Sequence, residues 1–246
     1  MKALIDGDSL LYKAGFTFEE KFDWNELEVE LGKSQPQYDY DTDLVAAKNA
    51  VDALIEAILF HTGTYEVEIW LSSPSNFRFT VDPTYKSNRS NSRKPLLYQE
   101  LLAYLTKKYN VYTAEGYEAD DKVVYLKTTY PDDYFLCAID KDVLYQTEGT
   151  HYNYHTSSMI TVTKEEADRF AYYQCLVGDQ VDGYPGCPGI GKVKATKLLD
   201  ESTDYWKTVV DTYKSKGLTE ADALKQMRLA NMHQLHNNII ILWSPS

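Results

Sequence analysis

Short apolar runs recur along the chain and predict β-strands. They lie at residues 2–5, 67–71, 111–113 and 134–139, with a further short apolar run at 239–243 that could add an edge strand. Between them, apolar residues spaced three or four positions apart predict amphipathic helices. These helical segments are residues 43–61, 95–108, 118–129, 163–177 and, with interruptions, 192–237. Strands that alternate with helices are typical of a mostly parallel sheet flanked by helices, so we expect an α/β fold.

Two segments show neither the apolar runs of strands nor the three-to-four-residue spacing of helices. Residues 72–94 are polar, and the Ser- and Asn-rich part from residue 84 onward cannot bury enough apolar surface to order itself alone. Residues 178–191 form a loop rich in glycine and proline. We therefore expect an α/β core at residues 1–177, with a flexible segment at about 84–108, and a helical region at 178–246 packed on that core.

Composition narrows the class of protein. The chain has 246 residues and a net charge of −12, which argues against a protein that coats nucleic acid by charge alone. Residues 78–108 nevertheless carry a local net charge of +5, and Lys192, Lys194 and Lys197 form a second basic patch. This distribution suits a metal-using enzyme.

There is no apolar run of membrane-span length and no signal peptide, so we expect no membrane partner and a cytoplasmic protein, in the host cytoplasm if the source is a phage. Three widely spaced cysteines predict reduced thiols.

Acidic residues follow the expected strands and open the expected helices. They are Asp6, Glu118, Asp120, Asp121, Asp140, Asp142, Asp179 and Asp182. Any one of them, taken alone, is best explained as a turn residue or a helix cap. Together at one sheet edge they would repel one another unless cations lay among them. Oxygen ligands select Mg²⁺ or Mn²⁺, and two such ions about 4 Å apart suit in-line attack on a phosphodiester.

Five stretches, in this order and at these intervals, resemble the 5′–3′ exonuclease and flap endonuclease family, and within it the short bacteriophage exonucleases. They are residues 4–11 (LIDGDSLL), 81–89 (VDPTYKSNR), 117–121 (YEADD), 138–142 (AIDKD) and 176–183 (LVGDQVDG), the last running on to 188–191 (PGIG). The resemblance covers most of the chain. It implies a PIN-like nuclease core followed by a helix–three-turn–helix.

The resemblance also implies roles for individual residues. The first of two Mg²⁺ or Mn²⁺ ions would be held by Asp6, Glu118 and Asp120. The second would be held or steered by Asp140, Asp142, Asp179 and Asp182, with Asp121 close behind and Asp8 behind the ligands of the first. Lys86 and Arg89 match the basic pair that reaches the scissile phosphate, although without the motif Lys86 would be read as a solvated loop lysine.

The glycine-rich turn has its own implied role. In the family, such a turn brings backbone groups to duplex phosphates, often with a monovalent cation such as K⁺ between them, and here it contains Gly189 and Gly191 followed by Lys192 and Lys194. An ordinary packing corner between helices is the alternative. The residues near 84–94 would form an arch over the site that orders on single-stranded DNA, with Arg93 and Lys94 adding DNA contacts.

One position departs from the family pattern. Relatives carry an Asp after the second strand, where this chain has Ser73, which can still hold a metal-bound water. We expect a monomeric, metal-dependent 5′ nuclease acting on DNA ends, flaps or single-stranded tails by a two-metal mechanism, with RNA–DNA hybrids as a further substrate. A catalytically weakened DNA-junction binding protein is the alternative that Ser73 supports. A ribonuclease of the related PIN-domain type is a third reading.

Overall fold

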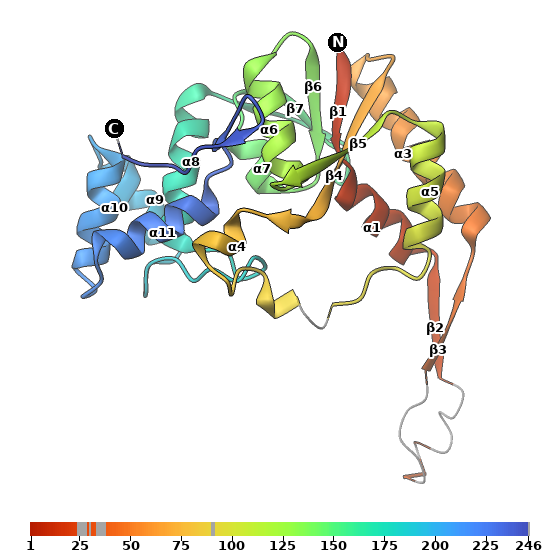
Figure 1. The fold of residues 1–246 in the computed structure, drawn as a ribbon, viewed down its shortest axis with the longest axis horizontal. Coiled ribbons are helices and arrows are strands. Elements are labelled where there is room, and N and C mark those ends of the chain that lie inside the picture. Colours follow the sequence, from red (N-terminus) through yellow and green to blue (C-terminus); the bar gives the residue numbers. More distant parts are fainter. Residues whose placement is uncertain (24–28, 30, 33–37, 90–91, 246) are drawn as a thin grey trace.

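The computed structural model describes residues 1–23, 29, 31–32, 38–89 and 92–245 (Figure 1). Within them the main sheet has six strands in the order β5-β4-β1-β6-β7-β8. The strands are β1 (Lys2–Asp6), β4 (Val67–Asn76), β5 (Val111–Gly116), β6 (Tyr134–Ala138), β7 (Gly149–Asn153) and β8 (Ser158–Val162). All neighbouring pairs are parallel except β7 and β8. The expected α/β fold with a mostly parallel sheet is confirmed.

Strand β1 lies at the centre because its side chains are apolar on both faces. Ala3 and Ile5 pack into one core with helices α1 (Gly7–Thr17), α3 (Leu44–Thr62) and α5 (Tyr98–Lys108). Leu4, between them, points to the opposite face and packs against α6 (Ala119–Thr129) and α7 (Lys141–Tyr145). Successive side chains of a strand alternate between faces, so this short run supports helices on both sides of the sheet.

A second core lies to one side of the sheet, where Figure 1 shows the last four helices gathered together. They are α8 (Lys164–Val177), α9 (Lys192–Asp200), α10 (Tyr205–Lys214) and α11 (Glu220–Ala230). Cys175 and Leu176 of α8 are fully buried there with Val209 and Met227. The expected capping box at Thr163 is present, and it fixes the start of α8.

Several elements differ from the sequence-based expectation. Residues 239–243 do not extend the main sheet, since β10 (Ile239–Ile240) pairs with β9 (Leu235–His236) in a separate hairpin. A second hairpin, β2 (Glu19–Asp23) with β3 (Tyr38–Thr42), was not expected. The polar stretch 72–94 contains the end of β4, the short helix α4 (Arg78–Val81) and a 3₁₀ turn at Ser87–Arg89. Helix α5 begins at Tyr98 rather than at Pro95.

Cys137, Cys175 and Cys187 are all buried and free. Across the described ranges, no helix combines the length and apolar character that crossing a membrane requires.

Candidate functional site

The predicted carboxylates lie where strands end and helices begin. Asp6 ends β1 and accepts hydrogen bonds from the Asp8 amide (3.2 Å) and the Ser9 hydroxyl (2.7 Å), so it also caps α1. Asp140 follows β6 and caps α7 by accepting from the Asp142 amide at 2.8 Å. Glu118 caps α6 in a capping box with Asp121. The capping explanation is therefore correct for these residues, and it also brings their side chains to one edge of the sheet.

Several of these carboxylates lie close enough together to affect one another's pKa. Burial, with Asp8 and Asp140 nearby, raises the pKa of Asp6 to about 7. Burial, followed by the charges of Asp6, Asp140 and Glu118, raises the pKa of Asp120 well above its ordinary value. The charge of Asp140 thus disfavours ionisation of Asp6 at the end of β1 and of Asp120 in α6. A positive charge placed among them would lower these pKa values.

A second group lies around Asp142, which is 6% exposed. Its carboxylate accepts from the Gln174 amide at 2.7 Å and from the Lys141 ammonium at 2.6 Å. Burial, with Asp140 nearby, still raises its pKa to about 6. Lys141 also pairs with Asp179 at 3.1 Å and, despite the opposing effect of burial, holds the pKa of that carboxyl below its usual range. Lys141 therefore bridges the β6–α7 junction and the loop after α8.

Lys86 and Arg89 lie at this edge as well, each paired with a predicted carboxylate. The Lys86 ammonium contacts Glu118 and lies 3.6 Å from Asp182, and the Arg89 guanidinium contacts Asp182. The Tyr85 hydroxyl donates to Glu118 at 3.1 Å and to Asp182 at 3.0 Å. Burial raises the pKa of Glu118, but Lys86 and Arg78 outweigh it and the pKa is lowered overall.

The described part of the expected arch is already tethered. The Asn88 amide donates to the carbonyl oxygens of Gln180 (2.6 Å) and Val181 (3.2 Å), and the Lys86 amide donates to the Asp182 carbonyl at 2.9 Å. Residues 84–89 thus order themselves on the loop after α8 through backbone acceptors, which local composition does not reveal. Residues 90 and 91 of the expected arch lie outside the described residues.

Asp121 has a different environment from the other carboxylates. Both of its oxygens accept from the Arg78 guanidinium at 2.7 Å, and one of them also accepts from the Glu118 amide at 3.0 Å. Arg78 is 2% exposed and donates further to the Leu229 carbonyl at 2.9 Å and to Glu118 at 3.2 Å. In the sequence, Arg78 is only one of several cations in a basic stretch. The structure makes it a buried link between α4, α6 and α11.

Four further expected residues also have defined neighbours. The Ser73 hydroxyl donates to the Ser75 carbonyl at 3.2 Å, and Asp8 accepts from the Ser72 amide at 3.0 Å. Arg93 contacts Glu19 of β2 and lies over the Tyr40 ring at 4.5 Å, while the Lys94 ammonium lies 3.9 Å from the Tyr98 ring centroid. Arg93 therefore joins the β2–β3 hairpin to the segment that leads into α5.

The glycine-rich turn leaves the start of α9 open. Gly189 has a φ of +73°, and a Cβ added there would meet nothing within 4 Å. Gly191 caps α9 without a side-chain hydrogen bond, so the first amides of the helix keep their capacity to donate. Lys192 and Lys194 are exposed beside it. This geometry suits an anion such as a phosphate.

Two other glycines hold the loop that carries Asp179 and Asp182. Gly178 has a φ of +74° and a ψ of 178°, and a Cβ there would lie 2.4 Å from the Pro185 carbonyl carbon. Gly186 has a φ of +66°, and a Cβ there would lie 2.3 Å from the Gly178 amide nitrogen. The two ends of the loop therefore pack backbone against backbone, which side chains would prevent.

We expect Gly178→Ala to lower the free energy of unfolding by about 3 kcal/mol or more, because a clash adds to the cost of a glycine-only backbone conformation. Urea denaturation measures this loss. Gly217→Ala is the matched control, since Gly217 has a φ of +76° but no atom within 4 Å of an added Cβ, and it should cost only about 1 kcal/mol. Equal losses in the two variants would contradict the close packing of the loop ends.

The donor set fits a hard divalent cation by its chemistry, because every candidate ligand is a carboxylate. Among the described residues, however, no three His, Cys, Asp or Glu side chains are arranged so that they could hold a metal ion as they stand. The Lys86 and Lys141 ammonium groups lie among the carboxylates and pair with them. Binding of an ion at this edge therefore requires carboxylates to turn toward it.

Several known nucleases are similar to this chain in sequence or in fold. No family model matches the chain. The exodeoxyribonuclease of Enterobacteria phage T3 is 27% identical, over 72% of this chain and 75% of its own length. The exonuclease of Escherichia phage T7 is 26% identical over the same shares. The D15 protein of phage T5, which was co-crystallised with metal ions, shares the fold with a TM-score of 0.64 and 15% identity, over 94% of this chain and 89% of its own. In sequence the chain is thus similar to phage exonucleases, and it shares the fold of the phage T5 D15 protein.

Proposed function

We propose that this protein is a metal-dependent nuclease that hydrolyses phosphodiesters of DNA from 5′ ends or flaps. The observation that carries this proposal is the group of carboxylates at the end of the parallel sheet, where the charge of Asp140 acts on the buried Asp6 and on Asp120 and Lys86 pairs with Glu118. Relatives named exodeoxyribonuclease and exonuclease support the same activity. Phage T5 D15 flap endonuclease was crystallised with DNA and metal ions, which supports DNA as the substrate.

In this proposal Asp6, Glu118 and Asp120 hold a first divalent ion, and Asp140, Asp142, Asp179 and Asp182 hold or steer a second. Mg²⁺ or Mn²⁺ bound there would supply Lewis-acid activation of water and stabilise charge on the departing oxygen. Asp121 acts through Arg78 and Glu118 as a positioning residue, since both of its oxygens accept from Arg78. Gln174 and Lys141 orient Asp142 by hydrogen bonds of 2.7 and 2.6 Å.

The basic side chains bind and orient the substrate. Lys86 and Arg89, which pair with Glu118 and Asp182 here, transfer their hydrogen bonds to the oxygens of the scissile phosphate. Tyr85 keeps this segment in place through its hydroxyl, which donates to both carboxylates. The open start of α9 with Gly189, Gly191, Lys192 and Lys194 binds duplex phosphates, with K⁺ as an additional ligand of the turn. We propose the α/β core at residues 1–177 and this helical region at 178–246 as two parts of one monomer.

We expect Lys86→Met to slow single-turnover cleavage by roughly 10²–10³-fold, the effect of removing one preorganised charge-stabilising group, while DNA affinity changes little. The substitution removes the Lys86 ammonium, which lies 5.1 Å from the Tyr85 ring centroid, but methionine keeps most of the apolar stem, so we expect the fold to be preserved. Lys107→Met, an exposed change in the same basic stretch, serves as the control and should keep the wild-type rate. An unchanged rate in Lys86→Met would remove this lysine from the mechanism.

The DNA-junction binding alternative rests on Ser73, whose hydroxyl is engaged with the Ser75 backbone. A protein of that kind would bind flapped DNA tightly and cleave it in neither Mg²⁺ nor Mn²⁺.

Parallel assays on a DNA duplex and an RNA–DNA hybrid with the same 5′ end test whether hybrids are a further substrate.

A further inference from the structure

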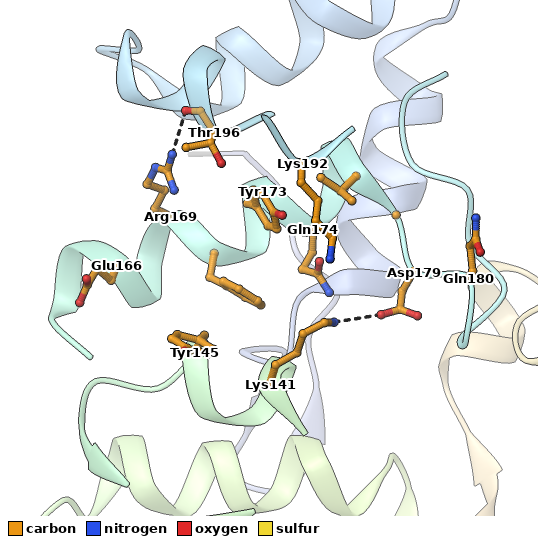
Figure 2. Close-up of a pocket in the computed structure, with 13 residues that line it drawn as sticks. Lys141, Tyr145, Glu166, Arg169, Tyr173, Gln174, Asp179, Gln180, Lys192 and Thr196 are labelled. Atoms are coloured by element: carbon orange, nitrogen blue, oxygen red, sulfur yellow. Dashed lines mark hydrogen bonds and ion pairs between the residues drawn. The ribbon is translucent and has the colours of Figure 1, made fainter. Parts of the chain in front are cut away.

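A cavity of about 670 Å³ lies between α7, α8 and the start of α9, beside the carboxylates (Figure 2). Its volume is within the range of sites that bind small organic ligands. Lys141 and Asp179, which pair at 3.1 Å, form the wall nearest the carboxylate edge. Gln174, which also lines the cavity, donates to Asp142. The cavity therefore opens next to the proposed catalytic site. It is lined by Asp179, a proposed ligand of the second ion, but by none of the proposed ligands of the first.

Aromatic rings form one side of this cavity. Tyr145 and Phe170 stack with ring centroids 5.5 Å apart and an angle of 22° between planes, and Tyr173 follows at 5.8 Å from Phe170. Tyr145 remains 40% exposed although it is part of this stack. A row of partly exposed aromatic rings offers a stacking surface to a nucleobase, and such stacking tolerates any base.

The opposite rim is basic. Lys192, the first residue of α9, lines the cavity and is exposed, and its ammonium makes no ion pair with the described residues. It lies at a helix start that lacks a side-chain cap, so charge and helix dipole both favour an anion there. Arg169 lines the same rim, held by the Thr196 carbonyl at 2.9 Å and by Asp200. These cations disfavour a purely apolar ligand or a metal ion in the cavity.

We propose that this cavity binds one unpaired nucleotide, with its base stacked against Tyr145 and Phe170 and its phosphate on Lys192. Duplex phosphates are then left to Lys194 and the Gly189–Gly191 turn, which do not line the cavity. The proposal rests on the proposed function, because a nuclease acting on DNA is what brings nucleotides to this place. Two sources supply the same chemistry. One is the free 5′-mononucleotide released by cleavage, and the other is an unpaired nucleotide still joined to a DNA strand.

The test is equilibrium binding in EDTA, where metal-dependent cleavage does not interfere. One arm titrates dTMP and thymidine by calorimetry, and the other follows the fluorescence of 2-aminopurine placed at successive unpaired positions of a flapped duplex. Tyr145→Ala should weaken the binding roughly 5- to 150-fold, the range for loss of one base–aromatic stack. Tyr145→Phe, which keeps the ring, and Tyr130→Ala, which removes a similarly exposed tyrosine (46%) elsewhere, should not.

The outcomes distinguish the two sources of the nucleotide. They also distinguish failure of the nucleotide site from failure of the proposed nuclease function. Binding of dTMP that exceeds binding of thymidine, with the difference lost in Lys192→Met, supports the free mononucleotide. Quenching of 2-aminopurine at one position, lost in Tyr145→Ala, supports the strand-attached nucleotide. Equal behaviour of wild type and Tyr145→Ala in both arms overturns the nucleotide site even if the protein cleaves DNA normally. Nucleotide binding that depends on Tyr145 in a protein without metal-dependent cleavage would leave the site standing and refute the nuclease.

Discussion

Asp140→Asn is expected to reduce DNA cleavage at least about a hundredfold while leaving the fold and DNA binding nearly unchanged. Asparagine has the size of aspartate and keeps an oxygen that accepts from the Asp142 amide, now at 2.8 Å, so the cap of α7 survives. It removes the negative charge that couples Asp140 to Asp6, Asp120 and Asp142. The variant therefore tests the negative charge of Asp140 separately from its role as the cap of α7.

Single-turnover cleavage and DNA affinity in EDTA are the two measurements for Asp140→Asn. Asp204→Asn is the matched control, because Asp204 also caps a helix, accepting from the Lys207 amide at 3.0 Å, but lies at the start of α10. The control should cleave at the wild-type rate. Full activity in Asp140→Asn would remove Asp140 from the site, and equal loss in both variants would show that helix capping rather than charge is responsible.

The largest expected effect on stability comes from Arg78→Met, which should lower the free energy of unfolding by about 3–5 kcal/mol. The substitution leaves Asp121, whose side chain is 1% exposed, as a buried charge with no cationic partner. It also removes the donor to the Leu229 carbonyl that joins α4 to the end of α11. Urea denaturation in EDTA measures the loss without any contribution from bound metal.

A second substitution distinguishes the buried charge from lost packing. Asp121→Asn, added to Arg78→Met, removes the uncompensated charge while keeping an acceptor for the Glu118 amide, and should recover about 1–3 kcal/mol. Lys164→Met, which breaks the exposed pair with Asp168, should cost less than about 1 kcal/mol. No recovery in the double variant would mean that packing, and not the ion pair, makes Arg78 important.

The predictable parts of the fold are those that depend on residues close together in the sequence. The apolar run at residues 2–5 predicted the central strand, and the Thr163 capping box predicted the start of α8. The β2–β3 hairpin could not be predicted in the same way, because neither its mostly charged residues at 19–23 nor its alternating tyrosine and aspartate residues at 38–41 signal a buried face. The rule that ligands bind at the carboxyl ends of parallel strands predicted that Asp6 and Asp140 lie near each other. In the structure the charge of Asp140 contributes to the raised pKa of Asp6.

The partners of the basic residues could not be predicted, because they lie far away in the sequence. Arg78 lies in a polar stretch, and its acceptors are Asp121, 43 positions away, and Leu229, 151 positions away. Arg93 likewise finds Glu19, 74 positions earlier. Repulsion among the carboxylates was expected from the sequence, but their burial was not. Burial is the largest cause of the raised pKa of Asp6, which is about 7, and it is set by tertiary packing.

Cleavage of a 5′-flapped DNA duplex labelled at both ends of the flapped strand tests the central claim most directly. The reaction is run in Mg²⁺, in Mn²⁺ and in EDTA. The proposed function predicts short products released from the 5′ side with either metal and none in EDTA, with the 3′ label retained on long strands. Release that starts at the 3′ label, or tight binding with no cleavage in either metal, would contradict the assignment of a 5′ nuclease.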